Sequence, residues 1–253
     1  MTLKIFAHQG GAAQWPANSL RAFEQVAKRA IDGVELDVHC ASDGVIVVTH
    51  DAFIAFGDRL RPVASLTSHE LRQGCEENGA GRSFDEVLEV LRPSNLDIQI
   101  DLKTDHHGRP YGDLTPRLAA LIGQYGLHDR VILSSFLPQA LVEARALLPA
   151  CRLRSGIMPL VTEQLGGTFA AIGRYKESGV SILDFNARMF DADALAAARA
   201  ASMEVGIGTI NGAPQLRDWM SQPIDRLLTD EPDLALAVRD ARTFSDIQEA
   251  RRA

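Results

Sequence analysis

The chain has 253 residues, of which 46% are hydrophobic and 23% are charged, values typical of a globular protein with one large domain or two small ones. A net charge of −7 argues against nucleic acid as a partner, because phosphate backbones require basic patches. No apolar run approaches the roughly 20 residues of a membrane-spanning helix, so no membrane span is expected. Three widely spaced cysteines and an N-terminus without signal-peptide features favour a cytoplasmic protein.

Short apolar runs alternate with amphipathic stretches along the chain. The runs predict strands at 3–8, 33–38, 96–102, 130–136, 152–157, 181–185, 204–210 and 225–230. Helices are predicted at 19–30, 84–91, 114–125, 138–147, 164–176, 191–201, 213–220 and 231–239. Eight strand–helix units in a chain of this length favour an α/β fold of the (β/α)8 or TIM-barrel type over an open sheet. We therefore predict a single domain over residues 1–253.

One connection is longer than the others. About 45 residues separate the second predicted strand from the helix at 84–91, which is too long for an ordinary βα loop. Loops at the carboxyl ends of barrel strands build the active sites of this fold. We therefore predict a small insertion after the second strand, residues 40–82, that lies over the active-site mouth.

The second predicted strand carries two carboxylates. Glu35 and Asp37 share one face because side chains alternate along a strand, and we expect His39 to point to the opposite face from Asp37. Two neighbouring carboxylates repel one another and are costly to bury unpaired. A divalent cation would relieve this cost, and oxygen ligands favour Mg²⁺ or Ca²⁺. The alternative is a pair of salt-bridged carboxylates at the barrel rim.

The third predicted strand adds a carboxylate and a lysine. Asp101 and Lys103 are two residues apart and therefore share a face. Asp101 would complete an oxygen triad on the adjacent strand, and Lys103 would place a cation above it. Such a group suits an anionic substrate, most naturally a phosphate. The alternative for Lys103 is a salt bridge to Asp101 or Asp105.

Two histidines end strand-like runs near these carboxylates. His8 follows the first predicted strand, and His50 follows the run VIVVT. A single histidine at a strand end is more often structural or exposed. Two histidines that converge on one carboxylate triad favour general acid and general base roles, since the imidazole pKa lies near neutrality.

These residues lie within a longer series of motifs that resembles the glycerophosphodiester phosphodiesterase family of the phospholipase C-like TIM-barrel superfamily. The most specific motifs are His8–Gly10, Pro16-x-Asn18-Ser19, Gly33-x-Glu35-x-Asp37-Val38 and His50-Asp51. The likeness continues through Asp101-x-Lys103, Ser134-Ser135-Phe136, Thr209-x-Asn211 and Thr229-Asp230-x-Pro232. It spans nearly the whole chain in the same order.

The resemblance implies hydrolysis of a small-molecule phosphodiester, either a glycerophosphodiester to an alcohol and glycerol 3-phosphate or a related sugar phosphodiester. It implies one divalent cation, Mg²⁺ or Ca²⁺, on Glu35, Asp37 and Asp101. His8 and His50 would form the acid–base pair, and Lys103 would bind the phosphate. In the family scheme a substrate hydroxyl next to the phosphodiester attacks phosphorus, the departing alcohol is protonated, and water then opens the cyclic phosphate.

The chain also departs from the family pattern. Gln9 stands where the family usually has an arginine, so this phosphate-binding position offers an uncharged amide. Arg154 and Arg188 are candidates for supplying the missing cation. Gly208 stands where a tryptophan is usual and is expected to leave room in the pocket wall. Ala17 replaces a usual glutamate, and Asp101 is shorter than the usual glutamate by one methylene.

These departures keep other functions open. One alternative is a catalytically impaired barrel that only binds a phosphorylated ligand, and another is a lysophospholipase D-like activity. A metal-dependent lyase or aldolase barrel is a third, although a Schiff-base lysine would not favour a carboxylate two residues away. The sequence does not determine the leaving alcohol or the metal used in the cell. It is compatible with a homo-oligomer and does not determine the oligomeric state.

Overall fold

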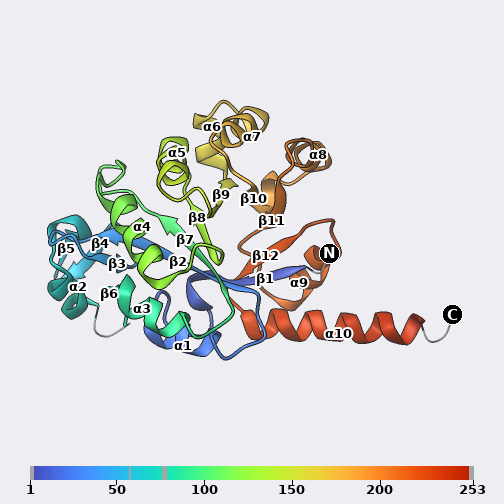
Figure 1. Cartoon of the computed structure of the whole chain (residues 1–253). Coiled ribbons are helices and arrows are strands. Elements are labelled where there is room, and N and C mark those ends of the chain that lie inside the picture. Colours follow the sequence, from blue (N-terminus) through green and yellow to red (C-terminus); the bar gives the residue numbers. More distant parts are fainter. Residues whose placement is uncertain (1–2, 57, 76–78, 251–253) are drawn as a thin grey trace.

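The computed structural model describes residues 3–56, 58–75 and 79–250. Parallel strands form a closed barrel with helices around it (Figure 1). In order around the barrel they are β1 (Lys4–Ala7), β2 (Gly33–Cys40), β7 (Asp97–Leu102), β8 (Val131–Ser134), β9 (Arg152–Ile157), β10 (Ile182–Phe185), β11 (Glu204–Ile207) and β12 (Arg226–Thr229). Because β1 pairs in parallel with both β2 and β12, the sheet closes on itself. The predicted (β/α)8 barrel and its eight strands are confirmed.

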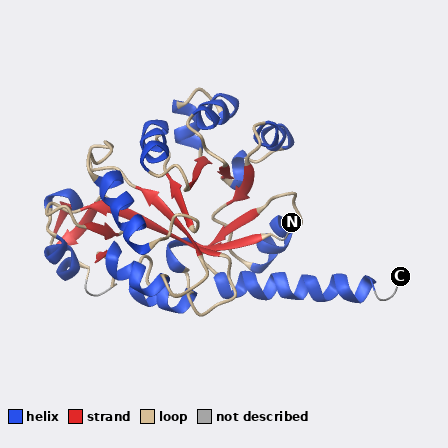
Figure 2. Ribbon diagram, viewed as in Figure 1, coloured by secondary structure: helices blue, strands red, loops and turns tan. Residues whose placement is uncertain are grey.

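The helices form the outer layer of the barrel (Figure 2). They are α1 (Leu20–Val26), α3 (Phe84–Leu91), α4 (Leu114–Tyr125), α5 (Pro138–Leu147), α6 (Pro159–Gln164), α7 (Thr168–Glu177), α8 (Ala192–Ala200), α9 (Ala213–Met220) and α10 (Pro232–Ala250). None of the described helices combines the length and the apolar character needed to cross a membrane.

Three helices differ from the prediction. The helix predicted at 19–30 ends at Val26 as α1. The helix predicted at 164–176 begins only at Thr168, as α7, and a separate helix, α6, ends at Gln164, because Gly166 and Gly167 have φ angles of 93° and 98°. A right-handed helix cannot continue through that conformation, which glycine adopts without a steric penalty. The last helix, predicted at 231–239, extends to Ala250 and projects from the barrel (Figure 1).

Alternation along β2 separates the hydrophobic core from the site. Val34, Leu36 and Val38 are fully buried and belong to the main hydrophobic cluster, together with Phe84 and Leu88 of α3. Truncating one such side chain to alanine typically costs about 2–5 kcal/mol of stability. The packed outer face therefore holds the residues between them, which point into the barrel, in fixed positions.

The long connection after β2 is folded. It contains β3 (Ile46–Val48), the hairpin of β4 (Phe53–Phe56) and β5 (Arg59–Pro62), η2 (Val63–Ser65), α2 (Ser68–Gly74) and β6 (Arg82–Ser83). Strand β3 pairs antiparallel with both β2 and β6, so this segment extends the barrel sheet. A second hydrophobic cluster, which includes Ile54, Leu66 and Leu71, supports it. The assignment of residues 40–82 as a cover over the mouth stays a prediction.

Candidate active site

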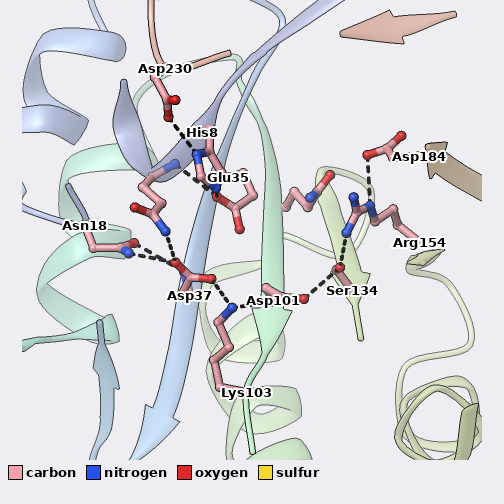
Figure 3. Close-up of polar contacts among 12 residues, drawn as sticks. His8, Asn18, Glu35, Asp37, Asp101, Lys103, Ser134, Arg154, Asp184 and Asp230 are labelled. Atoms are coloured by element: carbon pink, nitrogen blue, oxygen red, sulfur yellow. Dashed lines mark hydrogen bonds and ion pairs between the residues drawn. The ribbon is translucent and has the colours of Figure 1, made fainter. Parts of the chain in front are cut away.

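Three carboxylates meet inside the barrel. Asp37 of β2 and Asp101 of β7 are partners in the strand register, and Glu35 precedes Asp37 by two residues on the same face. Each residue offers an oxygen atom that lies within 4.8 Å of the others, and all three are buried (Figure 3). They line a cavity of about 170 Å³ together with His8 and His50. The residues predicted to bind metal and transfer protons thus lie at one place.

Lys103 lies between two of these carboxylates. Its Nζ is 2.8 Å from Asp37 Oδ1 and 2.8 Å from Asp101 Oδ2, so the predicted alternative of a salt bridge is present. Burial lowers the pKa of Lys103, but the two carboxylates outweigh burial and the net shift is upward. Burial likewise raises the pKa of Asp101, and the attraction of Lys103 reverses that shift to a net decrease. This lysine therefore stays charged and keeps Asp101 ionised.

Among the described residues, no lysine or arginine forms an ion pair with Glu35, whose ionisable partner is His8 with Nε2 at 3.9 Å. Burial and the neighbouring Asp37 raise its pKa to about 8, although His8 opposes part of that increase. A buried carboxyl group with this pKa takes up either a proton or a cation at neutral pH. The donor set contains only oxygen atoms, which suits Mg²⁺ or Ca²⁺. The three residues therefore fit a divalent ion.

His8 is held by a carboxylate from the other end of the chain. It begins η1 (His8–Gly10), directly after β1, and its Nδ1 lies 2.7 Å from Asp230 Oδ1. Asn211 Nδ2 donates to the other oxygen of Asp230 at 2.6 Å. Nδ1 therefore carries the proton, and Nε2 lies toward Glu35 at 3.9 Å. Burial lowers the pKa of His8, but Asp230 and Glu35 give a net increase.

His50 lies at the mouth, with 55% of its side chain exposed. Its Nδ1 is 2.7 Å from Asp51 Oδ1, so Nε2 is the nitrogen left for the cavity. His39 contacts the backbone of His50: its Nε2 donates to the His50 carbonyl at 3.2 Å. Its Nδ1 accepts a hydrogen bond from the Tyr111 hydroxyl at 2.9 Å. The prediction that His39 points away from Asp37 was wrong, because a period of two puts residues 37 and 39 on one face. Burial lowers the pKa of His39 to about 4, so it is neutral at pH 7.

Gln9 contacts the carboxylates in this structure. Its backbone N–H donates to Glu35 Oε2 at 3.0 Å, and its side-chain Nε2 donates to Asp37 Oδ2 at 2.9 Å. Asn18 Nδ2 donates to the same Asp37 oxygen at 2.8 Å. Gln9 and Asn18 thus orient two of the candidate metal ligands, and a role for Gln9 at the phosphate stays a prediction.

The structure also shows where Gly208 and the two candidate arginines, Arg154 and Arg188, lie relative to the cavity. Gly208 lines the cavity, and a Cβ atom added to it would lie 2.7 Å from Leu228 Cβ, so a side chain at this position would collide with Leu228. Arg154 is buried and lines the cavity. Arg188 is exposed in η3 (Ala187–Met189) and is not among the residues that line this cavity.

Comparison with known proteins identifies the family of this chain. The model of the Glycerophosphoryl diester phosphodiesterase family matches residues 8–234. The chain belongs to this family. It is therefore a phosphoric diester hydrolase, the enzyme class of the family.

Individual relatives resemble almost the whole chain. A glycerophosphodiester phosphodiesterase of Bacillus altitudinis is 29% identical over 252 residues, which cover 94% of this chain and 98% of the relative. A crystal structure from Agrobacterium tumefaciens has 22% identity and a TM-score of 0.87, covering 96% of this chain and 100% of that one. An Oleispira antarctica phosphodiesterase, solved with the product sn-glycerol-3-phosphate, has 23% identity and a TM-score of 0.77, covering 94% and 97%. These two structures share the fold.

Sequence reasoning missed three residues that orient the site of this glycerophosphoryl diester phosphodiesterase family member. Asn18 and Asp230 were noted only as parts of motifs, and their contacts with Asp37 and His8 join distant segments. His39 was set aside because it was assigned to the wrong face of its strand. The signal available for Asp230 was its place in the motif Thr229-Asp230-x-Pro232, at the end of the last predicted strand.

Proposed function

We propose that this family member hydrolyses a glycerophosphodiester, or a related sugar phosphodiester, in a metal-dependent reaction with His8 and His50 as the acid–base pair. The observation that carries the proposal is the convergence of both histidines and the carboxylate triad on one cavity. The glycerol-based substrate is supported by the Bacillus altitudinis relative and by the product bound to the Oleispira antarctica phosphodiesterase.

Glu35, Asp37 and Asp101 would hold one Mg²⁺ or Ca²⁺. A divalent ion bound there supplies positive charge that stabilises negative charge on the phosphoryl oxygens and helps to orient the attacking hydroxyl. The carboxylates keep lone pairs for this purpose, because each ionised carboxyl group has about four acceptor sites. Gln9, Asn18 and the other donors already present hold these groups in place.

His8 is the better candidate for the general base. Asp230 holds the proton on Nδ1, which leaves Nε2 to accept the proton of the attacking substrate hydroxyl. The same carboxylate stabilises the imidazolium that forms. The bond from this hydroxyl oxygen to phosphorus closes a cyclic phosphate as the bond to the leaving alcohol breaks.

His50 would act as the general acid. Its exposed position at the mouth lets protonated Nε2 donate to the oxygen of the departing alcohol, which then leaves toward solvent. In the second half of the reaction the roles reverse. His50 takes a proton from the attacking water, and His8 returns its proton to the hydroxyl oxygen that leaves phosphorus. Lys103, with its retained charge, and Gln9 would contact the phosphate.

The test is a turnover assay on purified protein. Release of the free alcohol from glycerophosphocholine, glycerophosphoethanolamine and a sugar phosphodiester is measured with Mg²⁺, with Ca²⁺ and with a chelator. We expect metal-dependent turnover of at least one substrate and a loss of about 10²–10⁴-fold in His8→Ala and in His50→Ala. His128→Ala is the matched control, because His128 does not line the cavity.

Other outcomes would assign other functions. Phosphate binding without turnover of any diester would indicate a barrel that only binds its ligand. Choline release from lysophosphatidylcholine, in preference to glycerophosphocholine, would indicate the lysophospholipase D-like activity.

A further inference from the structure

We propose that Arg154 is a second phosphate-binding cation of this site and supplies the charge that Gln9 lacks. The inference rests on the proposed function and concerns the residue that binds the phosphoryl group. Arg154 belongs to β9, whereas Gln9 follows β1, so the cation would come from a different strand of the barrel.

Arg154 has one donor group left for a ligand. Its Nε donates to Asp184 Oδ2 at 2.9 Å, and its Nη1 donates to Ser134 Oγ at 3.0 Å (Figure 3). Within the described part of the chain, no oxygen accepts a hydrogen bond from Nη2. The residue is 5% exposed and lines the same cavity as Lys103. A buried guanidinium with an unpaired donor at a cavity wall is a built site for an anion.

Gly156 keeps this donor uncovered. It lies two residues after Arg154 in β9, on the same face and nearer the carboxyl end of the strand. A Cβ atom at this position would lie 3.5 Å from Arg154 Nη2 and 2.9 Å from the ring of Phe136. A glycine in a strand often marks a place where a ligand approaches closely. Here its missing side chain leaves the guanidinium open toward the mouth.

The charges around the cavity also favour this role. Three carboxylates line it, with Lys103 and Arg154 as the permanent cations. With a divalent ion added, these groups carry one net positive charge, which matches the single negative charge of a phosphodiester. Asp184 does not cancel Arg154, because Asp184 Oδ1 also lies 3.4 Å from Arg226 Nε. Gln9 cannot supply the charge, and its amide donates to Asp37.

The test measures anion binding directly. Inorganic phosphate is titrated into the Mg²⁺-loaded protein by calorimetry, and Mg²⁺ affinity is measured in parallel. Removing one charge-assisted hydrogen bond in Arg154→Gln should weaken phosphate binding roughly tenfold to 100-fold and raise KM for the diester by a similar factor, with Mg²⁺ affinity unchanged. Arg154→Lys keeps the positive charge beside Asp184 but lacks the free Nη2 donor, so phosphate binding should weaken by a smaller factor of about threefold to tenfold. This variant serves if Arg154→Gln does not fold.

Arg152→Gln is the matched control. Arg152 lies on the same strand and pairs with Asp97 at 2.7 Å, and it does not line the cavity. The inference is overturned if both Arg154 variants bind phosphate within about twofold of the parent protein. It is also overturned if phosphate affinity falls only together with Mg²⁺ affinity, since Arg154 would then act by positioning Asp101 through Ser134. Absence of turnover in the parent protein would instead count against the proposed function, and phosphate binding remains measurable in that case.

Discussion

Metal binding at the carboxylate triad should depend steeply on pH, because Glu35 has to lose a proton before it can bind a cation. Burial and the neighbouring Asp37 raise the pKa of Glu35 to about 8. Only the ionised carboxylate binds a hard cation well. With this pKa, about 10% of Glu35 is ionised at pH 7 and about 1% at pH 6. The apparent Mg²⁺ affinity should therefore be about 100-fold weaker at pH 6 than at pH 9.

Calorimetric titration of chelator-treated protein with Mg²⁺ at pH 6, 7, 8 and 9 measures this dependence. At pH 7, titrations in two buffers with different ionisation enthalpies count the released protons, and about one proton per bound ion is expected. His8→Asn is the control, because it removes the titrating neighbour and leaves Glu35 in place. Proton release should persist in this variant. An affinity that changes less than about threefold between pH 9 and pH 6, or binding without proton release, would refute the reasoning.

Three further predictions follow from the contacts around the site. Asp230→Asn should lower kcat by about 100-fold or more, because an amide does not fix the Nδ1–H form of His8, and the pKa seen in the pH–rate profile should fall; an unchanged profile would contradict this role. Burial lowers the pKa of His39 to about 4, so between about pH 6.5 and 4 this histidine is protonated in the unfolded state but not in the folded state. The free energy of unfolding therefore falls as pH falls through this window. In urea titrations, the free energy of unfolding of the parent should fall by about 2.5 kcal/mol more between about pH 7 and about pH 4.5 than that of His39→Gln. Equal decreases in the two proteins would contradict the lowered pKa of His39. Lys103→Met should lower the melting temperature of the metal-free protein, since two buried carboxylates lose their shared cation, and Mg²⁺ should raise it more in the variant than in the parent; equal metal-induced increases would argue against the shared role.

The features that could be predicted from the sequence depend on short-range periodicity. A period of two places Glu35 and Asp37 on one face, and the same rule aligns Asp101 with Lys103. Once eight such strands are expected, barrel closure puts their carboxyl ends at one mouth. The strands, the barrel and the grouping of these side chains were accessible for that reason.

The features that could not be predicted depend on contacts between distant segments or on space around one atom. The partner of His8 lies 222 residues away in the chain, and only the pairing of β1 with β12 brings the two together. Periodicity likewise does not show that the Gln9 amide donates to Asp37, or that a side chain at position 208 would collide with Leu228. These facts follow from side-chain packing, which local sequence patterns do not encode.

The pairing of the first and last barrel strands has a consequence for synthesis of the chain. A nascent polypeptide that ends before β12 already contains both histidines and all three carboxylates. It lacks Asp230, the carboxylate that holds the proton on His8 Nδ1. Under the proposed mechanism, full activity therefore requires the final strand to pair with the first, so turnover would distinguish a completed barrel from a partly assembled one.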